Sequence, residues 1–231
     1  MTFLDILNLP LALKYRFILF MQPRCSFQCS FNIFIPFLFF ITTILKPKKI
    51  VQLGVAQKTC YFAFCQIIKQ FQYDTTCYGI DNLSNYEKND QKTIHNKILE
   101  LNKEYDSFST FVKSTFDNST NIDHLKDIDI LNIDVLEGYE EISKIFDIYL
   151  PKMSNKGVIL LHFINQKNND NGVSKFWSNI SKKYPNFKLS ISEGLGVLMV
   201  GKNKNEELKS LSKSKYFKYY EQLFKILGSI L

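Results

Sequence analysis

Short apolar segments alternate with longer mixed segments from Lys49 onward, and this alternation constrains the fold more than any other feature of the chain. Short apolar runs separated by helical patterns of about 10–15 residues are typical of βα units around a parallel sheet. The run Gly157–Phe163 (GVILLHF) is apolar throughout, which predicts a central strand buried on both faces. The pattern therefore predicts an α/β protein whose sheet is covered on both sides.

The individual segments can be assigned from their length and periodicity. Parallel strands are expected at Ile50–Gly54, Thr76–Asp81, Phe108–Lys113, Ile128–Asp134 and Gly157–Phe163, and a closing antiparallel pair at Phe187–Ile191 and Gly196–Val200. Helices are expected at Ile33–Leu45, Thr59–Phe71, Glu87–Glu104, Gly138–Leu150 and Val173–Lys183. Five parallel strands and a hairpin make a sheet of seven strands.

The most apolar segment, Ile33–Leu45, is predicted to be a buried helix. It has 13 residues, whereas a membrane span needs about 20, and Pro36 interrupts it. No secretory signal is expected, because the apolar run begins late and no small-residue cleavage site follows it. A peripheral membrane contact through this segment or Phe17–Met21 stays open.

The positive charge lies mainly at the two ends of the chain. The formal net charge is +7, but residues 1–50 carry six Lys/Arg against one acid, residues 51–202 carry 17 against 18, and residues 203–231 carry six against three. We therefore divide the chain into an N-terminal extension (1–30), a main domain (31–202) and a C-terminal amphipathic basic helix (203–231). That helix docks on its own domain or offers a seam to a partner or a lipid surface.

The charge distribution also predicts which partners the chain binds. The main domain is nearly neutral and only Arg16 and Arg24 are arginines, which argues against nucleic-acid binding. The basic ends favour an anionic membrane or an acidic partner protein; the alternative is that their lysines only keep the protein in solution. Five cysteines, an odd number, suggest reduced thiols and a cytoplasmic protein, with a peripheral membrane location left open.

Three residues mark the ends of the expected strands. In open α/β sheets a ligand binds beyond the carboxyl ends of the strands, where Gly54, Asp81 and Asp134 are expected. A glycine lets the ligand approach the backbone, and an acid on the neighbouring strand accepts hydrogen bonds from ribose hydroxyls. Asp81 follows Gly54 by 27 residues, which suits a nucleoside site.

Longer stretches of the chain carry a family resemblance. They are FIPFLFFITTILKPKKIVQLGVAQKTCYFAFCQ (34–66), YGID (78–81), LNIDVLEGYEEISKIFDIYLPKMSNKGVILLHF (131–163) and NGVSKFWSNISKKYPNFKLSISEGLGVLMVG (171–201). In this order and spacing they resemble the class I S-adenosylmethionine-dependent methyltransferases often found next to, or fused with, glycosyltransferases. The resemblance implies a Rossmann-like seven-stranded, mostly parallel sheet with helices on both faces and an antiparallel last strand.

The resemblance also implies a cofactor, S-adenosylmethionine, and roles for particular residues. Gly54 lies under the cofactor, Asp81 holds the ribose, and the turn Ser114–Phe116 approaches the adenine. Asp134 lies where methyl donor and acceptor meet, and in related enzymes an acid there helps to bind a divalent metal such as Mg²⁺. The implied cofactor contacts are Gln52, Gly54, Ala56, Asp81 and Thr115.

Several positions depart from the family pattern. Gln52 stands where the family has an acid, Lys58 where it has a glycine, and His162-Phe163 where it has His-Asp. The family's His-Ile-Asp-Gly-x-His stretch reads NIDVLE at 132–137, so a metal on Asp134 needs Glu137 or His162 to complete its site. Asp134, Glu137 and His162 are accordingly the candidate catalytic residues.

Two functions remain compatible with these residues. The first is methyl transfer to a hydroxyl of a sugar or other small molecule, with metal assistance at Asp134 left open. The second is a methyltransferase-like domain without catalysis, which serves as a binding or scaffolding module at a membrane or partner protein.

Overall fold

Seven strands form one sheet in the computed structural model, which describes residues 9–24, 32–55, 60–84, 86–121, 125–165 and 172–231. The strands are β1 (Lys49–Leu53), β2 (Thr76–Asp81), β3 (Ser109–Lys113), β4 (Ile128–Ile133), β5 (Met153–His162), β6 (Asn186–Leu189) and β7 (Leu195–Met199). Their order is β3-β2-β1-β4-β5-β7-β6. The first five run parallel and β7 is antiparallel to both of its neighbours, which confirms the predicted Rossmann-like sheet.

The centre of the sheet is buried on both faces because its strands are apolar almost throughout. Every residue of β4 is buried, and so is β5 from Gly157 onward. β5 begins at Met153, four residues earlier than its apolar run predicted, because Met153 pairs with Ile128 across an irregularity in the β4–β5 ladder. The polar residues Gln52 and Asn132 lie opposite each other in the β1–β4 register.

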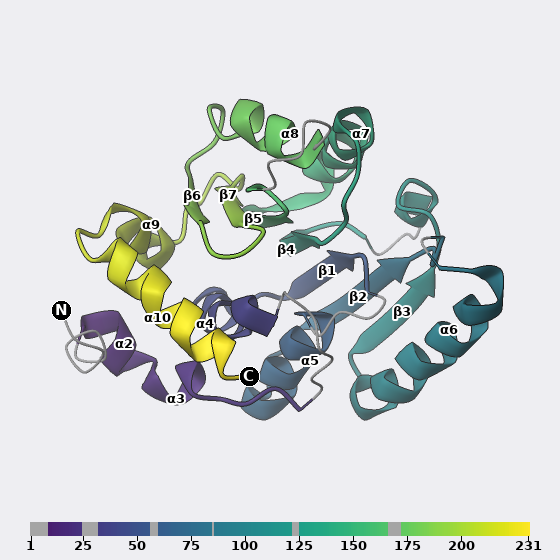
Figure 1. Cartoon of the computed structure of the whole chain (residues 1–231), viewed down its shortest axis with the longest axis horizontal. Coiled ribbons are helices and arrows are strands. Elements are labelled where there is room, and N and C mark those ends of the chain that lie inside the picture. Colours follow the sequence, from purple (N-terminus) through teal and green to yellow (C-terminus); the bar gives the residue numbers. More distant parts are fainter. Residues whose placement is uncertain (1–8, 25–31, 56–59, 85, 122–124, 166–171) are drawn as a thin grey trace.

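Helices lie on both sides of the sheet (Figure 1). The α-helices are α2 (Pro10–Lys14), α3 (Arg16–Leu19), α4 (Ile35–Leu45), α5 (Cys60–Phe71), α6 (Lys88–Asn102), α7 (Tyr139–Tyr149), α8 (Gly172–Ile180), α9 (Glu206–Lys213) and α10 (Phe217–Ser229). Short 3₁₀ turns are η1 (Asn32–Phe34), η2 (Lys103–Tyr105), η3 (Asn118–Asn121) and η4 (Leu150–Lys152). α4 packs against α5, and α7 packs against α8. In Figure 1 the first pair lies on one side of the sheet and the second pair on the other.

The predicted apolar helix is α4, and it is enclosed by the protein. Nine of its eleven residues are buried, because other elements cover it on all sides. It ends at Leu45; the next residue, Lys46, has a φ of 43°, in the left-handed region, and Pro47 follows. Proline restricts the residue before it to non-helical conformations, which explains where the helix stops.

Both ends of the described chain pack on α4. The Phe37 ring of α4 meets the Phe224 ring of α10 at 5.3 Å between centroids, and Phe40 meets Tyr15 at 5.2 Å. Glu207 of α9 accepts hydrogen bonds from Lys14 and Tyr15. In Figure 1 the N-terminal helices (purple) and the C-terminal helices (yellow) lie side by side at one end of the molecule.

The C-terminal tail forms two helices, where the apolar spacing predicted one. Ser214 separates them: its backbone is extended (φ −65°, ψ 132°), and its side-chain oxygen accepts a hydrogen bond from the Tyr216 amide at 3.1 Å. Serine competes with helical hydrogen bonds in this way, so a new helix begins just after it. Within the described ranges, no helix combines the length and the hydrophobicity needed to cross a membrane.

Candidate cofactor site

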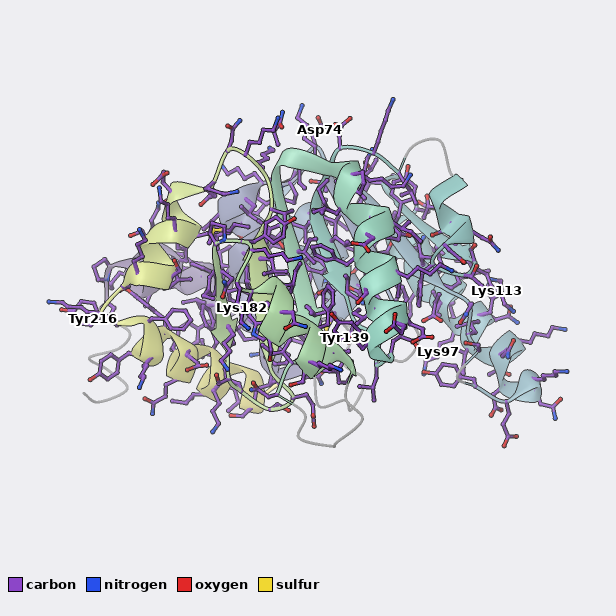
Figure 2. All side chains as sticks on the ribbon, turned by 90° about the horizontal axis from the view of Figure 1, so that it is seen from above. Asp74, Lys97, Lys113, Tyr139, Lys182 and Tyr216 are labelled. Carbon is purple, nitrogen blue, oxygen red and sulfur yellow. The ribbon has the colours of Figure 1, made fainter. Side chains whose placement is uncertain are left out.

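The carboxyl ends of β1, β2 and β4 meet at one edge of the sheet. Figure 2 looks at the molecule from above: Lys113 at the end of β3 and Tyr139 at the start of α7 lie toward one edge, and Asp74, which precedes β2, lies at the other. Two backbone hydrogen bonds fix the strand tips, from Gly54 N to Ile80 O and from Asp134 N to Leu53 O, both at 2.9 Å. The three residues predicted to mark the site therefore lie on adjacent strands.

Gly54 allows the β1 tip to pass close to the β4 tip. Its φ of +83° lies in the left-handed region, and a Cβ at this position would collide with the carbonyl oxygen of Asp134. Only glycine meets both conditions without strain. Gly54 thus leaves a wall of bare backbone at this edge of the sheet.

Asp81 is held rigidly at the end of β2. Its Oδ2 accepts a hydrogen bond from Val55 N at 2.7 Å and its Oδ1 accepts one from Leu83 N at 2.8 Å. A carboxylate has about four acceptor positions, and these two bonds fix its orientation. The carboxylate is therefore held in a defined position at the tip of β2.

A cavity opens over these tips, and we call it the cofactor cavity. Its lining residues are Gly54, Asp81, Asn82, Ser84, Tyr86, Phe116, Asp134, Val135, Leu136 and Glu137. Burial and the carboxylates of Asp81 and Asp134 raise the pKa of Tyr86, which keeps its phenol protonated and able to donate. The cavity thus combines a bare backbone wall, a fixed carboxylate and a phenol.

A second cavity adjoins the first, and we call it the Thr115 cavity. It is lined by Asn82, Thr115, Phe116, Asp117, Glu137, Glu141, Lys144, Ile145 and Ile148. Three of these residues, Asn82, Phe116 and Glu137, also line the cofactor cavity. The two cavities therefore form one two-part cleft that runs from the β1 tip to α7.

Hydrogen bonds fix the loop that carries Phe116. Tyr149 donates from its hydroxyl to Phe116 O at 3.1 Å and lies 2.6 Å from the Ser119 hydroxyl, and burial raises the pKa of Tyr149 to about 12. The Thr115 hydroxyl and the Lys144 ammonium, which is 3.0 Å away, lower the pKa of Asp117 to about 2. Contacts with Tyr149 and Lys144 thus hold this wall of the Thr115 cavity in place.

Glu137 lies where the two cavities meet. It is half-buried, and burial, together with the negative charge of Glu141, raises its pKa above the ordinary value of a glutamate. A carboxylate with a raised pKa accepts a proton more readily than a solvated one. Glu137 thus combines a position between the two cavities with a raised pKa.

A chain of buried polar side chains runs behind the cofactor cavity. Gln52 Nε2 donates to Gly54 O at 2.8 Å, and Asn132 Nδ2 donates to Gln52 Oε1 at 3.0 Å. Asn132 Oδ1 in turn lies 3.0 Å from His162 Nε2. These side chains are fully buried, so Gln52 supports the backbone of Gly54 and does not line the cavity.

Three potential metal ligands lie together at the end of this chain. Cys60, Asp134 and His162 each offer one ligand atom, all within 4.8 Å of one another, and all three residues are buried. Asp134 Oδ1 and His162 Nδ1 are 3.7 Å apart. The sequence does not predict Cys60 as a ligand, because it lies far along the chain from Asp134 and His162 and forms no short ligand motif with them.

The structure brings most of the predicted site residues together. Gly54, Asp81, Asp134 and Glu137 line one cavity and Thr115 lines its neighbour. Gln52 and His162 lie behind the cavity wall. Ala56 and Lys58, predicted in the loop after β1, fall outside the described residues.

Comparisons with known proteins agree with this geometry. Residues 51–164, which run from β1 to just beyond β5, match a family model described as a methyltransferase domain. An uncharacterized protein, y4gI of Sinorhizobium fredii, is 27% identical over 183 residues, which are 78% of this chain and 20% of that protein. The chain thus spans one fifth of the length of this curated relative.

Solved structures share the fold at low sequence identity. The O-methyltransferase TomG from Streptomyces achromogenes, solved in complex with SAM, is 11% identical, with a TM-score of 0.54 over 83% of this chain and 87% of TomG. The SAH-bound methyltransferase PaMTH1 from Podospora anserina is 13% identical, with a TM-score of 0.57 over 81% of this chain and 86% of that one. The chain therefore shares its fold with these solved methyltransferases.

Proposed function

We propose that this chain binds S-adenosylmethionine in the two-part cleft and transfers a methyl group to a hydroxyl oxygen of a sugar or another small molecule. One observation carries the proposal: the Asp81 carboxylate is held by Val55 N and Leu83 N at the wall of a cavity that also contains Gly54. A carboxylate at this strand tip typically accepts hydrogen bonds from the vicinal hydroxyls of a ribose.

The shape of the cleft supports a nucleoside ligand. The Thr115 cavity offers the Phe116 ring and the apolar side chains of Ile145 and Ile148, which suit a flat base. The cofactor cavity contains the Asp81 carboxylate, which would bind the ribose, and extends to Asp134. A ligand with a base at one end and a ribose in the middle would therefore place its remaining part at the β4 tip.

The chain's own residues would act on the acceptor at that tip. When bound, S-adenosylmethionine supplies an electrophilic methyl group on a sulfonium. The acceptor oxygen would form a bond to the methyl carbon as the carbon–sulfur bond breaks, and the electron pair of the broken bond would stay on sulfur and neutralise it. Glu137, whose raised pKa favours protonation, receives the hydroxyl proton and passes it to water.

The choice of a hydroxyl acceptor rests on Glu137 and Asp134, and the choice of a sugar rests on the resemblance to methyltransferases found beside glycosyltransferases. Both carboxylates lie in the cofactor cavity, where they can accept hydrogen bonds from a polyhydroxylated acceptor. A binding or scaffolding module without catalysis is the second proposal, and it differs in predicting no methyl transfer.

Calorimetry with S-adenosylmethionine tests the cofactor site. We expect the full chain to bind it, and Asp81→Asn to bind it about tenfold or more weakly, since a charge-assisted hydrogen bond contributes about 1.5–3 kcal/mol. Asp74→Asn is the matched control, because Asp74 is exposed and precedes the same strand at the opposite edge of the sheet. No binding at millimolar cofactor, or equal loss in both variants, would refute the proposal.

Methyl transfer is tested separately with the labelled cofactor and a panel of sugars and small phenols. Radiolabel in a hydroxyl-bearing product supports catalysis. Cofactor binding without transfer to any acceptor, in a protein that keeps its calorimetric affinity, supports the binding module.

A further inference from the structure

Three side chains from three separate elements converge behind the cofactor cavity: Cys60 is the first residue of α5, Asp134 follows β4, and His162 ends β5. We call them the Cys60 cluster. All are buried, and the Phe34 ring lies edge-on to the imidazole of His162 at 5.6 Å. A thiol, a carboxylate and an imidazole gathered in an apolar setting need a chemical explanation.

The hydrogen-bond chain defines the tautomer of His162. Gly54 O can only accept, so Gln52 must direct its amide nitrogen to it and its carbonyl oxygen to Asn132. Asn132 must then direct its own carbonyl oxygen to His162, and Nε2 of His162 must carry the proton that it donates. In the neutral ring the lone pair is therefore on Nδ1, the nitrogen that faces the cluster.

The distance between His162 and Asp134 suits two ligands of one ion. Nδ1 and Oδ1 lie 3.7 Å apart, which is longer than a hydrogen bond. Two ligand atoms at about 2.0–2.1 Å from a tetrahedral zinc ion are about 3.4 Å apart, so a shift of a few tenths of an ångström would bring this pair to metal geometry. The Cys60 sulfur lies within 4.8 Å of both atoms.

The donor set selects the kind of metal. Mg²⁺ prefers six oxygen ligands and keeps several waters, which a buried thiol, imidazole and carboxylate do not provide. Sulfur, nitrogen and oxygen together are typical of zinc and similar transition metals, and three protein ligands leave a fourth position open. The hydrogen bond that His162 Nε2 donates to Asn132 Oδ1 is the kind of outer contact that orients a metal-binding histidine.

We infer that the Cys60 cluster binds one Zn²⁺-class ion, in place of the Mg²⁺ that the family resemblance implies. Asp134 belongs both to the cluster and to the cofactor cavity, so the ion would lie directly behind the cavity wall. Resting on the proposed function, an ion held there would fix the position of the Asp134 carboxylate at the tip of β4, beside the proposed acceptor.

Metal analysis and cobalt spectroscopy of the full chain test this site without any assay of activity. The protein is stripped with a chelator, loaded with Zn²⁺ or Co²⁺ and dialysed. We expect about one equivalent of metal and a thiolate-to-cobalt charge-transfer band in the near ultraviolet. Cys60→Ser should abolish the band and weaken binding about 100-fold, and Asn132→Leu should keep the band and weaken binding about 10- to 100-fold.

Cys65→Ser is the matched control, because Cys65 is a second buried cysteine of α5 outside the cluster. The inference is overturned if the loaded wild-type chain retains far less than one equivalent, or if Cys60→Ser and Cys65→Ser give the same cobalt spectrum. Asp134→Asn serves in place of Cys60→Ser if that variant does not fold. Calorimetry on the stripped protein separates the two proposals: cofactor binding without metal retention leaves the proposed function standing and removes this site.

Discussion

Gly54 sets how closely a ligand can approach the edge of the sheet. Its positive φ and its contact with the Asp134 carbonyl each exclude a side chain. We expect Gly54→Ala to lower the free energy of unfolding by roughly 1–3 kcal/mol and to weaken S-adenosylmethionine binding about tenfold or more, as measured by denaturant unfolding and calorimetry.

Gly138→Ala is the control for this substitution. Gly138 has an ordinary φ of −63°, and a Cβ there would meet only the carboxylate end of the Glu141 side chain, which can rotate away. Equal effects of the two substitutions on stability and binding would contradict the structural role assigned to Gly54.

Glu137 determines how the proposed activity depends on pH. Its pKa is raised by burial and by Glu141, and a base acts only when it is deprotonated, so activity should be lost as the pH falls through a value above that of an ordinary glutamate. Glu141→Gln removes the repulsion and should move this acidic limb of the kcat profile to lower pH. Glu137→Gln should reduce kcat about 10²- to 10⁴-fold and remove the limb.

The opposite result is equally clear. An acidic limb that Glu141→Gln leaves in place, or a Glu137→Gln variant with full kcat, would assign the proton to another group. Cofactor affinity, measured by calorimetry at each pH, shows whether a change arises in binding or in the chemical step.

The residues at the strand tips could be predicted from the sequence, but the residues behind them could not. Gly54, Asp81 and Asp134 stand at the ends of recognisable apolar runs, so their edge follows from the alternation of strands and helices. Asn132 and Cys60 gain their roles from contacts with residues far along the chain, such as Gln52, 80 positions before Asn132. No local pattern marks them, because their surroundings exist only once the sheet has formed.

At the scale of elements, α4 is the support on which the chain ends are assembled. Gly228 of α10 lies against the backbone of Ile33, where an added Cβ would collide with the Ile33 carbonyl. Gly228→Val should therefore push α10 away from η1, the turn that leads into α4, and lower the free energy of unfolding by roughly 1–3 kcal/mol. Ser229→Ala, at the exposed neighbouring position, should change it by less than about 0.5 kcal/mol.

Thermal and denaturant unfolding measure this difference. Equal stability of the two variants would show that α10 contributes little to the packing of α4. A loss confined to Gly228→Val supports a tail that is part of the folded domain.

The elements differ in how well the sequence predicts them. The sequence predicts the strands and α4 closely, because a continuous apolar run is stable only where the fold buries it on all sides. The tail was predicted as one helix because its apolar residues keep helical spacing across Ser214, and spacing carries no information about a side chain that hydrogen-bonds its own backbone.

At the scale of the whole molecule, the two basic ends lie on the same side. α2 and α3 lie beside α9 and α10, and α6 lies at the opposite end of the sheet (Figure 1). Leu13, Phe17 and Phe20 of the α2–α3 segment are exposed to 47%, 76% and 47%. Arg16 lies among them in the sequence, as does Lys14, which also pairs with Glu207 of α9. Apolar side chains next to cations are typical of surfaces that bind anionic lipid.

We expect the full chain to sediment with anionic vesicles at low salt and to release as the salt concentration rises, because each cation near such a surface contributes about 1 kcal/mol. Phe17→Ser should reduce the bound fraction several-fold. Leu99→Ser is the matched control, since Leu99 is 42% exposed on α6, far from the basic ends. Equal binding by the two variants, or wild-type protein that stays in the supernatant at low salt, would leave the surplus lysines with a role in solubility alone. A loss of vesicle binding in Phe17→Ser alone would instead assign two roles to the molecule. The nearly neutral domain would contain the cleft, and the basic end would attach the protein to a membrane.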